Sequence, residues 1–229
     1  MTALRRERLA GLLWLAATIP SAFAFGFARG RLIIAGDALA TANLVVAQQG
    51  LYRAWIAALW LTNLLMLLFG VTLYPSLRDR NRGLARMFLI STAASVAVAM
   101  AMTVVQVGAI LILAPDIAKP LGMATQPLSA LFTRLANAGL GVSELLWAPA
   151  YMSFGLIFIR LQGVPRFLGI ALMAMGLGFV INSFEKLLAP AFYPAAFTEL
   201  AMALGAIGGL PSMIWLIAKR TAFGAISQT

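Results

Sequence analysis

The sequence predicts an all-α integral membrane protein, built as a bundle of six transmembrane helices with short interfacial helices. Of its 229 residues, 62% are hydrophobic and only 10% are charged. A soluble domain is about half apolar and about a quarter charged. The chain therefore has too little polar surface to cover a globule in water.

Six apolar stretches are long enough to span a bilayer, which takes about 20 residues because the hydrocarbon layer is about 30 Å thick. We expect spans near residues 9–28, 54–73, 84–113, 138–159, 167–189 and 200–218. Residues 127–137 are expected as a short interfacial helix, because the run from 127 to 159 is too long for one upright span. Pro20 should kink the first span. No linker divides the chain, so residues 1–229 are interpreted as a single polytopic domain.

The N-terminus resembles a secretory signal peptide, because basic residues and an apolar run precede Ala22-Phe23-Ala24, which has the A-x-A pattern of a cleavage site. The apolar run continues to Ala28, and five further spans follow. A retained first helix is the preferred interpretation.

Basic residues are distributed unevenly between the two sides. With the N-terminus inside, eleven of the seventeen Lys and Arg and only two of the seven Asp and Glu fall on the cytoplasmic side. The positive-inside rule therefore predicts that both termini are cytoplasmic. Attraction to anionic headgroups of the lipid bilayer explains the net charge of +10, so no nucleic-acid partner is expected.

The absence of Cys and His removes thiol nucleophiles, imidazole bases and most metal sites. No cofactor, metal site or catalytic set is expected. An intramembrane enzyme would have to use Glu144 and Glu185, and no nucleophile motif or phosphate loop accompanies them.

Polar side chains inside spans are costly and often mark function. The candidate ligand-binding residues concentrate toward the external leaflet, and they are Asp37, Arg53, Gln106, Arg134, Glu144, Asn182 and Glu185. Asn182 and Glu185 share a helix face, as do Asn137 and Glu144. Two facing helices would thus present carboxylates and amides to one outward-facing cavity, with Arg53 or Arg134 as counter-charge.

Each candidate also has a structural interpretation. Glu185 can snorkel to the interface, and Arg134 can pair with a headgroup. Asp37 fits the N-cap of a short helix, with binding of a ligand cation as the alternative. Glu144 lies deeper and is harder to dismiss. Asn63, near the middle of the second span, is expected to form an interhelical hydrogen bond.

Small residues gather on faces where helices can approach closely. They include Gly169, Gly176 and Gly178 in the fifth span, and Ala201, Gly205, Gly208, Gly209 and Ser212 in the last. These faces are interpreted first as seams between helices.

Three groups of residues resemble one bacterial family of polytopic membrane proteins, the domain of unknown function 4386. They are residues 8–15, residues 36–43 running on to 51–53, and the spacing of Gly155, Arg160, Pro165, Arg166, Gly169, Gly176, Gly178, Asn182 and Ser183. The resemblance implies a multi-pass inner-membrane protein. Asn182 stands where members usually carry Asp, and Ala150 stands where many carry His.

The preferred hypothesis is a protein that binds a small or amphiphilic molecule in a cavity open to the external leaflet. A broader version of this hypothesis adds that the protein moves the molecule across the membrane. The first alternative is a non-catalytic accessory or structural subunit of a larger membrane complex, with a membrane-protein partner. The second is the intramembrane enzyme.

Overall fold

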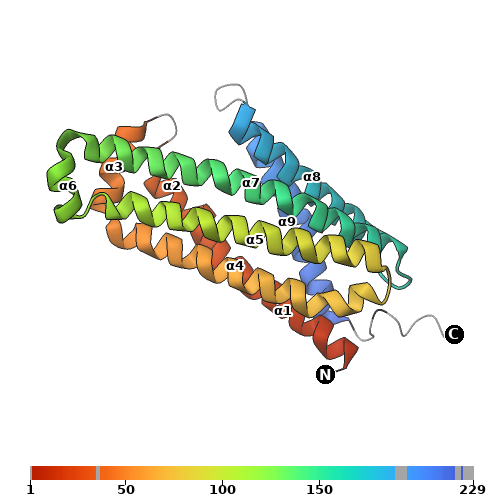
Figure 1. Cartoon of the computed structure of the whole chain (residues 1–229). Coiled ribbons are helices and arrows are strands. Elements are labelled where there is room, and N and C mark those ends of the chain that lie inside the picture. Colours follow the sequence, from red (N-terminus) through yellow and green to blue (C-terminus); the bar gives the residue numbers. More distant parts are fainter. Residues whose placement is uncertain (1, 35–36, 189–194, 220–222, 224–229) are drawn as a thin grey trace. The chain divides into compact units, whose positions relative to one another are not determined.

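A computed structural model describes residues 2–34, 37–188, 195–219 and 223. Helices make up 91% of the structure, and the described residues contain no strand (Figure 1). The elements are α1 (Ala3–Ser21), η1 (Ala22–Ala28), α2 (Arg29–Leu32), α3 (Ala38–Ala47), α4 (Gln49–Arg78), α5 (Arg82–Leu111), α6 (Pro115–Leu121), η2 (Gly122–Ala124), α7 (Thr125–Arg160), α8 (Arg166–Leu188) and α9 (Ala195–Ala218). The prediction of an all-α fold is confirmed.

Five helical segments are long and apolar enough to cross a membrane. They are Ala3–Leu32, Gln49–Arg78, Arg82–Leu111, Pro115–Arg160 and Arg166–Phe184. In the sixth predicted stretch, the part of α9 that can be assessed is the shorter apolar helix Ile207–Ala218. The chain is thus a multi-pass membrane protein by length and composition, with five clear candidate spans rather than six.

The first span is irregular at Pro20. The α-helical hydrogen bonding of α1 ends at Ser21, and the next seven residues, η1, are π-helical. Proline has no backbone N–H to donate, so one bond of the α-helical ladder is lost there. Near Pro20 the first span therefore changes from α-helical to π-helical hydrogen bonding.

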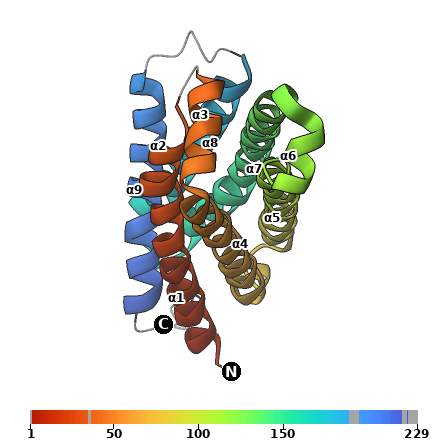
Figure 2. The ribbon, with the colours of Figure 1, turned by 90° about the vertical axis from the view of Figure 1, so that its left-hand side faces the viewer.

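The prediction of a separate interfacial helix over residues 127–137 is wrong. These residues belong to α7, which runs for 36 residues. Pro127 lies in the first turn of α7, where a missing N–H costs nothing, and residues 128–137 contain no Gly or Pro to stop the helix. The short helix is instead α6, which lies at the turn between α5 and α7 (Figure 2).

Contacts between residues divide the chain into two compact units. Unit 1 comprises Met1–Ala16, Leu65–Val96 and Gly141–Thr229, and unit 2 comprises Ala17–Leu64 and Ala97–Leu140. The core of unit 1 is aromatic, with ring centroids 5.0 Å apart for Trp14 and Phe69 and 4.4 Å apart for Phe154 and Phe158. The core of unit 2 is formed by Leu32, Val45, Tyr52, Trp55, Ile56, Leu59 and Ile110.

Glycines let the helices of unit 1 approach closely. A Cβ on Gly155 of α7 would lie 2.6 Å from the carbonyl oxygen of Gly169 in α8. A Cβ on Gly208 of α9 would overlap the carbonyl of Ala171 in α8, and α8 and α9 lie side by side (Figure 1). The interhelical seams predicted at Gly169, Gly176 and Gly208 are confirmed.

Candidate functional site

Glu144 and Asn182 come together between α7 and α8 in unit 1. The Nδ2 atom of Asn182 donates a hydrogen bond of 2.6 Å to Oε2 of Glu144. Both side chains are half-buried. The structure thus brings a carboxylate of the fourth predicted span against an amide of the fifth. That the pair binds a ligand stays a prediction.

Aromatic rings lie about one helical turn from this pair. Trp147 follows Glu144 by three residues, and Phe179 precedes Asn182 by three, so each shares a face with its polar neighbour. Tyr151 packs against both rings, at 5.6 Å from Trp147 and 5.6 Å from Phe179 between centroids. Trp147 and Tyr151 are buried. The carboxylate therefore has a rigid aromatic layer beside it.

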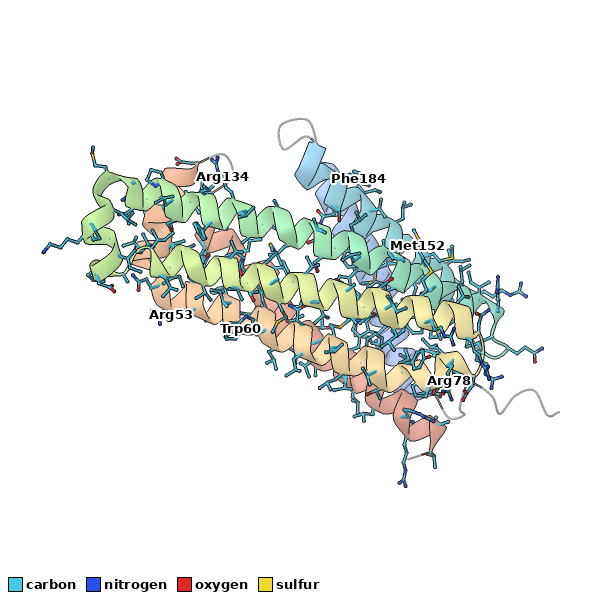
Figure 3. The ribbon with its side chains drawn as sticks, viewed as in Figure 1. Arg53, Trp60, Arg78, Arg134, Met152 and Phe184 are labelled. Atoms are coloured by element: carbon cyan, nitrogen blue, oxygen red, sulfur yellow. The ribbon has the colours of Figure 1, made fainter. Side chains whose placement is uncertain are left out.

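The other charged candidates are Glu185, Arg53 and Arg134. Glu185 lies in α8, but its side chain is outside the part of the chain that the structure describes. Arg53 of α4 and Arg134 of α7 belong to unit 2, where both side chains are exposed (Figure 3). No ion pair joins either arginine to a described carboxylate of unit 2. Their role as counter-charges stays a prediction.

Gln106 is enclosed in unit 2. Its side chain is 0% exposed, and neither amide atom has a hydrogen-bond partner among the described atoms. Its backbone oxygen accepts a long bond of 3.4 Å from the Tyr52 hydroxyl. The indole N–H of Trp55, equally buried, has no partner among those atoms either. That Gln106 binds a ligand stays a prediction.

The structure decides two further expectations. Asp37 is the N-cap of α3, and its Oδ1 accepts a hydrogen bond of 2.9 Å from the backbone N–H of Ala40, so the capping interpretation is confirmed. Asn63 was expected to bond to another helix. Its Nδ2 instead donates to the carbonyl of Leu59, one turn back in α4, at 2.8 Å. That expectation is wrong because a carbonyl of the same helix lies within reach.

A buried ion pair joins the two ends of the chain in unit 1, which the sequence alone did not predict. Nζ of Lys219 lies 2.5 Å from Oε2 of Glu7, and their side chains are only 4% and 1% exposed. The guanidinium of Arg8 donates to the Lys219 carbonyl at 2.8 and 3.2 Å. Phe223 places its ring 3.3 Å from Lys219 Nζ and donates its backbone N–H to Glu7 at 3.3 Å. Burial lowers the pKa of the Lys219 ammonium, and the Glu7 carboxylate opposes this shift.

Next to this ion pair, unit 1 contains an open cavity of about 260 Å³. It is lined by Arg80, Asn81, Ile157, Arg160, Leu161, Gln162 and Phe223. Asn81 caps α5 by accepting a hydrogen bond from the Leu84 N–H, and Gly163 adopts φ +76° in the turn that follows α7. The two turns therefore hold arginine and amide side chains around one hollow. The arginines were visible in the sequence, but no pattern in it indicated that these turns meet.

The Glu144–Asn182 contact predicts that Asn182→Asp lowers the stability of unit 1. The substitution replaces an amide donor with a second carboxylate at hydrogen-bond distance, and like charges there repel. We expect a loss of about 2 kcal/mol at neutral pH in unfolding by detergent titration. The double variant Glu144→Gln/Asn182→Asp restores a donor and an acceptor, and should recover most of that loss. Equal losses in the single and double variants would contradict the assignment.

Comparison with known proteins gives one match. The family model described as Domain of unknown function (DUF4386) matches residues 9–219. No curated protein and no solved structure matches the chain significantly. The match covers almost the whole chain, including both helices of the Glu144–Asn182 contact.

Proposed function

Since the chain belongs to the family described as Domain of unknown function (DUF4386), we propose that it is a bacterial inner-membrane protein that binds a small or amphiphilic molecule beside Glu144. In this proposal residues 1–229 form a single polytopic domain of six spanning helices, with both termini in the cytoplasm. A broader version of the proposal adds that the protein transports the bound molecule across the membrane.

The contact between the chain ends supports an even number of spans. Glu7, near the start of α1, pairs with Lys219, directly after α9, and the two helices lie side by side at this end (Figure 2). Five crossings would leave the end of α8 on the opposite side of the membrane from Glu7. A crossing by α9 would bring Lys219 back to the side of Glu7, so the ion pair supports six spans.

The cavity in unit 1 supports the proposed orientation. It brings the turn before α5 and the turn before α8 together with Phe223, which is bonded to Glu7. Both turns therefore lie on the same side of unit 1 as Glu7 and Lys219. This is the side that carries eleven of the seventeen basic residues, so the positive-inside rule favours a cytoplasmic location for it.

The hydrogen bond between Glu144 and Asn182 is the observation that carries the binding proposal. A carboxylate inside a spanning helix is costly and usually serves a function. Asn182 contacts Glu144 through a neutral amide, and the carboxylate is half-buried. A ligand that carries a cationic or hydrogen-bond-donating group on an apolar body would complement this carboxylate and the neighbouring Phe179.

The packing favours this proposal over an accessory subunit. The accessory-subunit hypothesis rested on the abundance of small-residue faces and on the absence of any catalytic set in the sequence. At Gly155, Gly169, Gly176 and Gly208 these faces are filled by helices of the same chain. An accessory subunit would therefore need another docking surface.

Native mass spectrometry of protein gently extracted from its own membranes tests the proposal. We expect wild type to retain a small molecule that Glu144→Gln loses, because this variant removes the charge and keeps the shape and the acceptor. We also expect the lipophilic cation tetraphenylphosphonium to raise the unfolding temperature of wild type but not of Glu144→Gln. A stoichiometric protein partner with no retained small molecule would support the accessory subunit instead.

A further inference from the structure

The cavity at the basic end of unit 1 is separate from the Glu144 site. It offers two guanidinium groups, from Arg80 and Arg160, and two side-chain amides, from Asn81 and Gln162. Oδ1 of Asn81 is occupied by the cap of α5, so its amide nitrogen is the atom that it can offer to a ligand. The polar part of the lining thus presents chiefly hydrogen-bond donors and positive charge.

Two carboxylates of unit 1, those of Glu7 and Asp79, lie near this lining, and each is close to a basic residue. Glu7 is buried against Lys219 at 2.5 Å. Asp79, in the turn beside Arg80, lies 3.7 Å from Arg78, which is at the end of α4 (Figure 3). No carboxylate is among the lining residues. Arginine pairs well with phosphate, because its planar fork matches two phosphate oxygens at once.

The rest of the lining is apolar. Ile157, Leu161 and the Phe223 ring form this part of the wall. Phe223 is held in place by its bond to Glu7 and by its contacts with the rings of Phe158 at 5.7 Å and Trp215 at 5.8 Å. A ligand with a phosphate and an adjoining carbon skeleton would therefore meet complementary surfaces on both sides of the cavity.

We propose that this cavity binds a phosphate-bearing anion, with the phosphate held by Arg80 and Arg160 and its carbon skeleton against Ile157, Leu161 and Phe223. Two sources share this chemistry, an anionic phospholipid headgroup and a soluble phosphorylated molecule. The cavity lies where spanning helices end, at the level of headgroups, and basic pockets between membrane helices are known to hold such groups.

The test uses the full-length protein in dodecyl maltoside, titrated separately with dioleoylphosphatidylglycerol, dioleoylphosphatidylcholine and sodium phosphate at constant ionic strength. Unfolding temperature and native mass spectrometry report binding. We expect phosphatidylglycerol or phosphate to stabilise wild type more than phosphatidylcholine does. Arg80→Gln/Arg160→Gln should weaken this binding at least about tenfold, because two charge-assisted contacts are lost.

Arg86→Gln is the matched control. Arg86 is an exposed arginine of α5 that does not line the cavity, so its loss should change the affinity by no more than about twofold. If the double variant cannot be purified, Gln162→Glu, which places a negative charge on the exposed part of the wall, should also weaken binding. Stabilisation by phosphatidylglycerol alone supports a lipid headgroup, and competition by free phosphate supports a soluble ligand. Equal effects in Arg86→Gln and the cavity variants, or equal binding of phosphatidylcholine, would overturn the proposal.

Discussion

Gly169→Ala is expected to lower the free energy of unfolding by about 2 kcal/mol, and Gly169→Val by more, because both overpack the seam between α7 and α8. A Cβ on Gly169 would lie 2.6 Å from Cγ1 of Ile159, 2.7 Å from the Gly155 carbonyl oxygen and 2.9 Å from the Ile159 backbone nitrogen. Backbone atoms cannot rotate away, so the two helices must separate and lose contact along the seam. Unfolding in mixed micelles, followed by circular dichroism, measures the loss.

Gly50→Ala is the control for helix propensity. Gly50 lies in the first turn of α4, and a Cβ there would meet nothing within 4 Å. Alanine is favoured over glycine in a helix, so this variant should match or exceed wild type by up to about 1 kcal/mol. If Gly169→Ala behaved like Gly50→Ala, the close approach of α7 and α8 would be wrong.

The spans were predictable from sequence because they depend on the local density of apolar residues. Each of five predicted stretches lies wholly or mostly within one long apolar helix of the structure. Helix ends were harder to predict. The length of the run from 127 to 159 suggested a break near Asn137, whereas α7 continues through it, because a helix can be longer than the bilayer is thick.

Neighbour relations were predictable only where the residues themselves restrict packing. Gly169 and Gly208 indicated close seams, since only small residues permit them. The apolar pattern says nothing about which helices are adjacent, because lipid and protein interior are equally apolar. The sequence therefore could not predict that Glu7 pairs with Lys219, 212 residues away. It also could not predict that Arg80 and Arg160 line one cavity.

The candidate site, too, was predictable from the sequence only in part. The helical spacing indicated which polar residues share a face of one helix, and the structure shows that Glu144 and Asn182 are in contact. Depth along a helix, however, does not determine which side chain is enclosed, and Gln106 is buried although its depth matches that of the other candidates. Glu7 stands among three arginines in the sequence, and no pattern there predicted its burial. Its burial depends on the end of α9 covering it.

Glu7→Gln is expected to lower the free energy of unfolding by about 3 kcal/mol at neutral pH, since removing one member of a buried ion pair leaves the other charge uncompensated. Lys219 would remain buried beside Arg8, and the Phe223 N–H would keep only an amide oxygen as its acceptor. Replacing both charges, as in Glu7→Leu/Lys219→Met, should cost less than Glu7→Gln alone, because no buried charge is left behind. The comparison uses thermal unfolding in detergent.

The pH dependence provides an independent check on the same contact. Burial already lowers the pKa of Lys219, and Glu7 is the group that opposes this shift, so Glu7→Gln should lower that pKa further. Between the lowered pKa and the ordinary lysine value of about 10.4, the unfolded chain binds more protons than the folded one, and stability therefore rises with pH. The deficit of Glu7→Gln should shrink as the pH is raised from about 7 toward that value, while Glu7→Leu/Lys219→Met should show no such recovery. A deficit of Glu7→Gln that stayed constant across this range would mean that Lys219 is exposed to water, and that the ends of α1 and α9 do not enclose it.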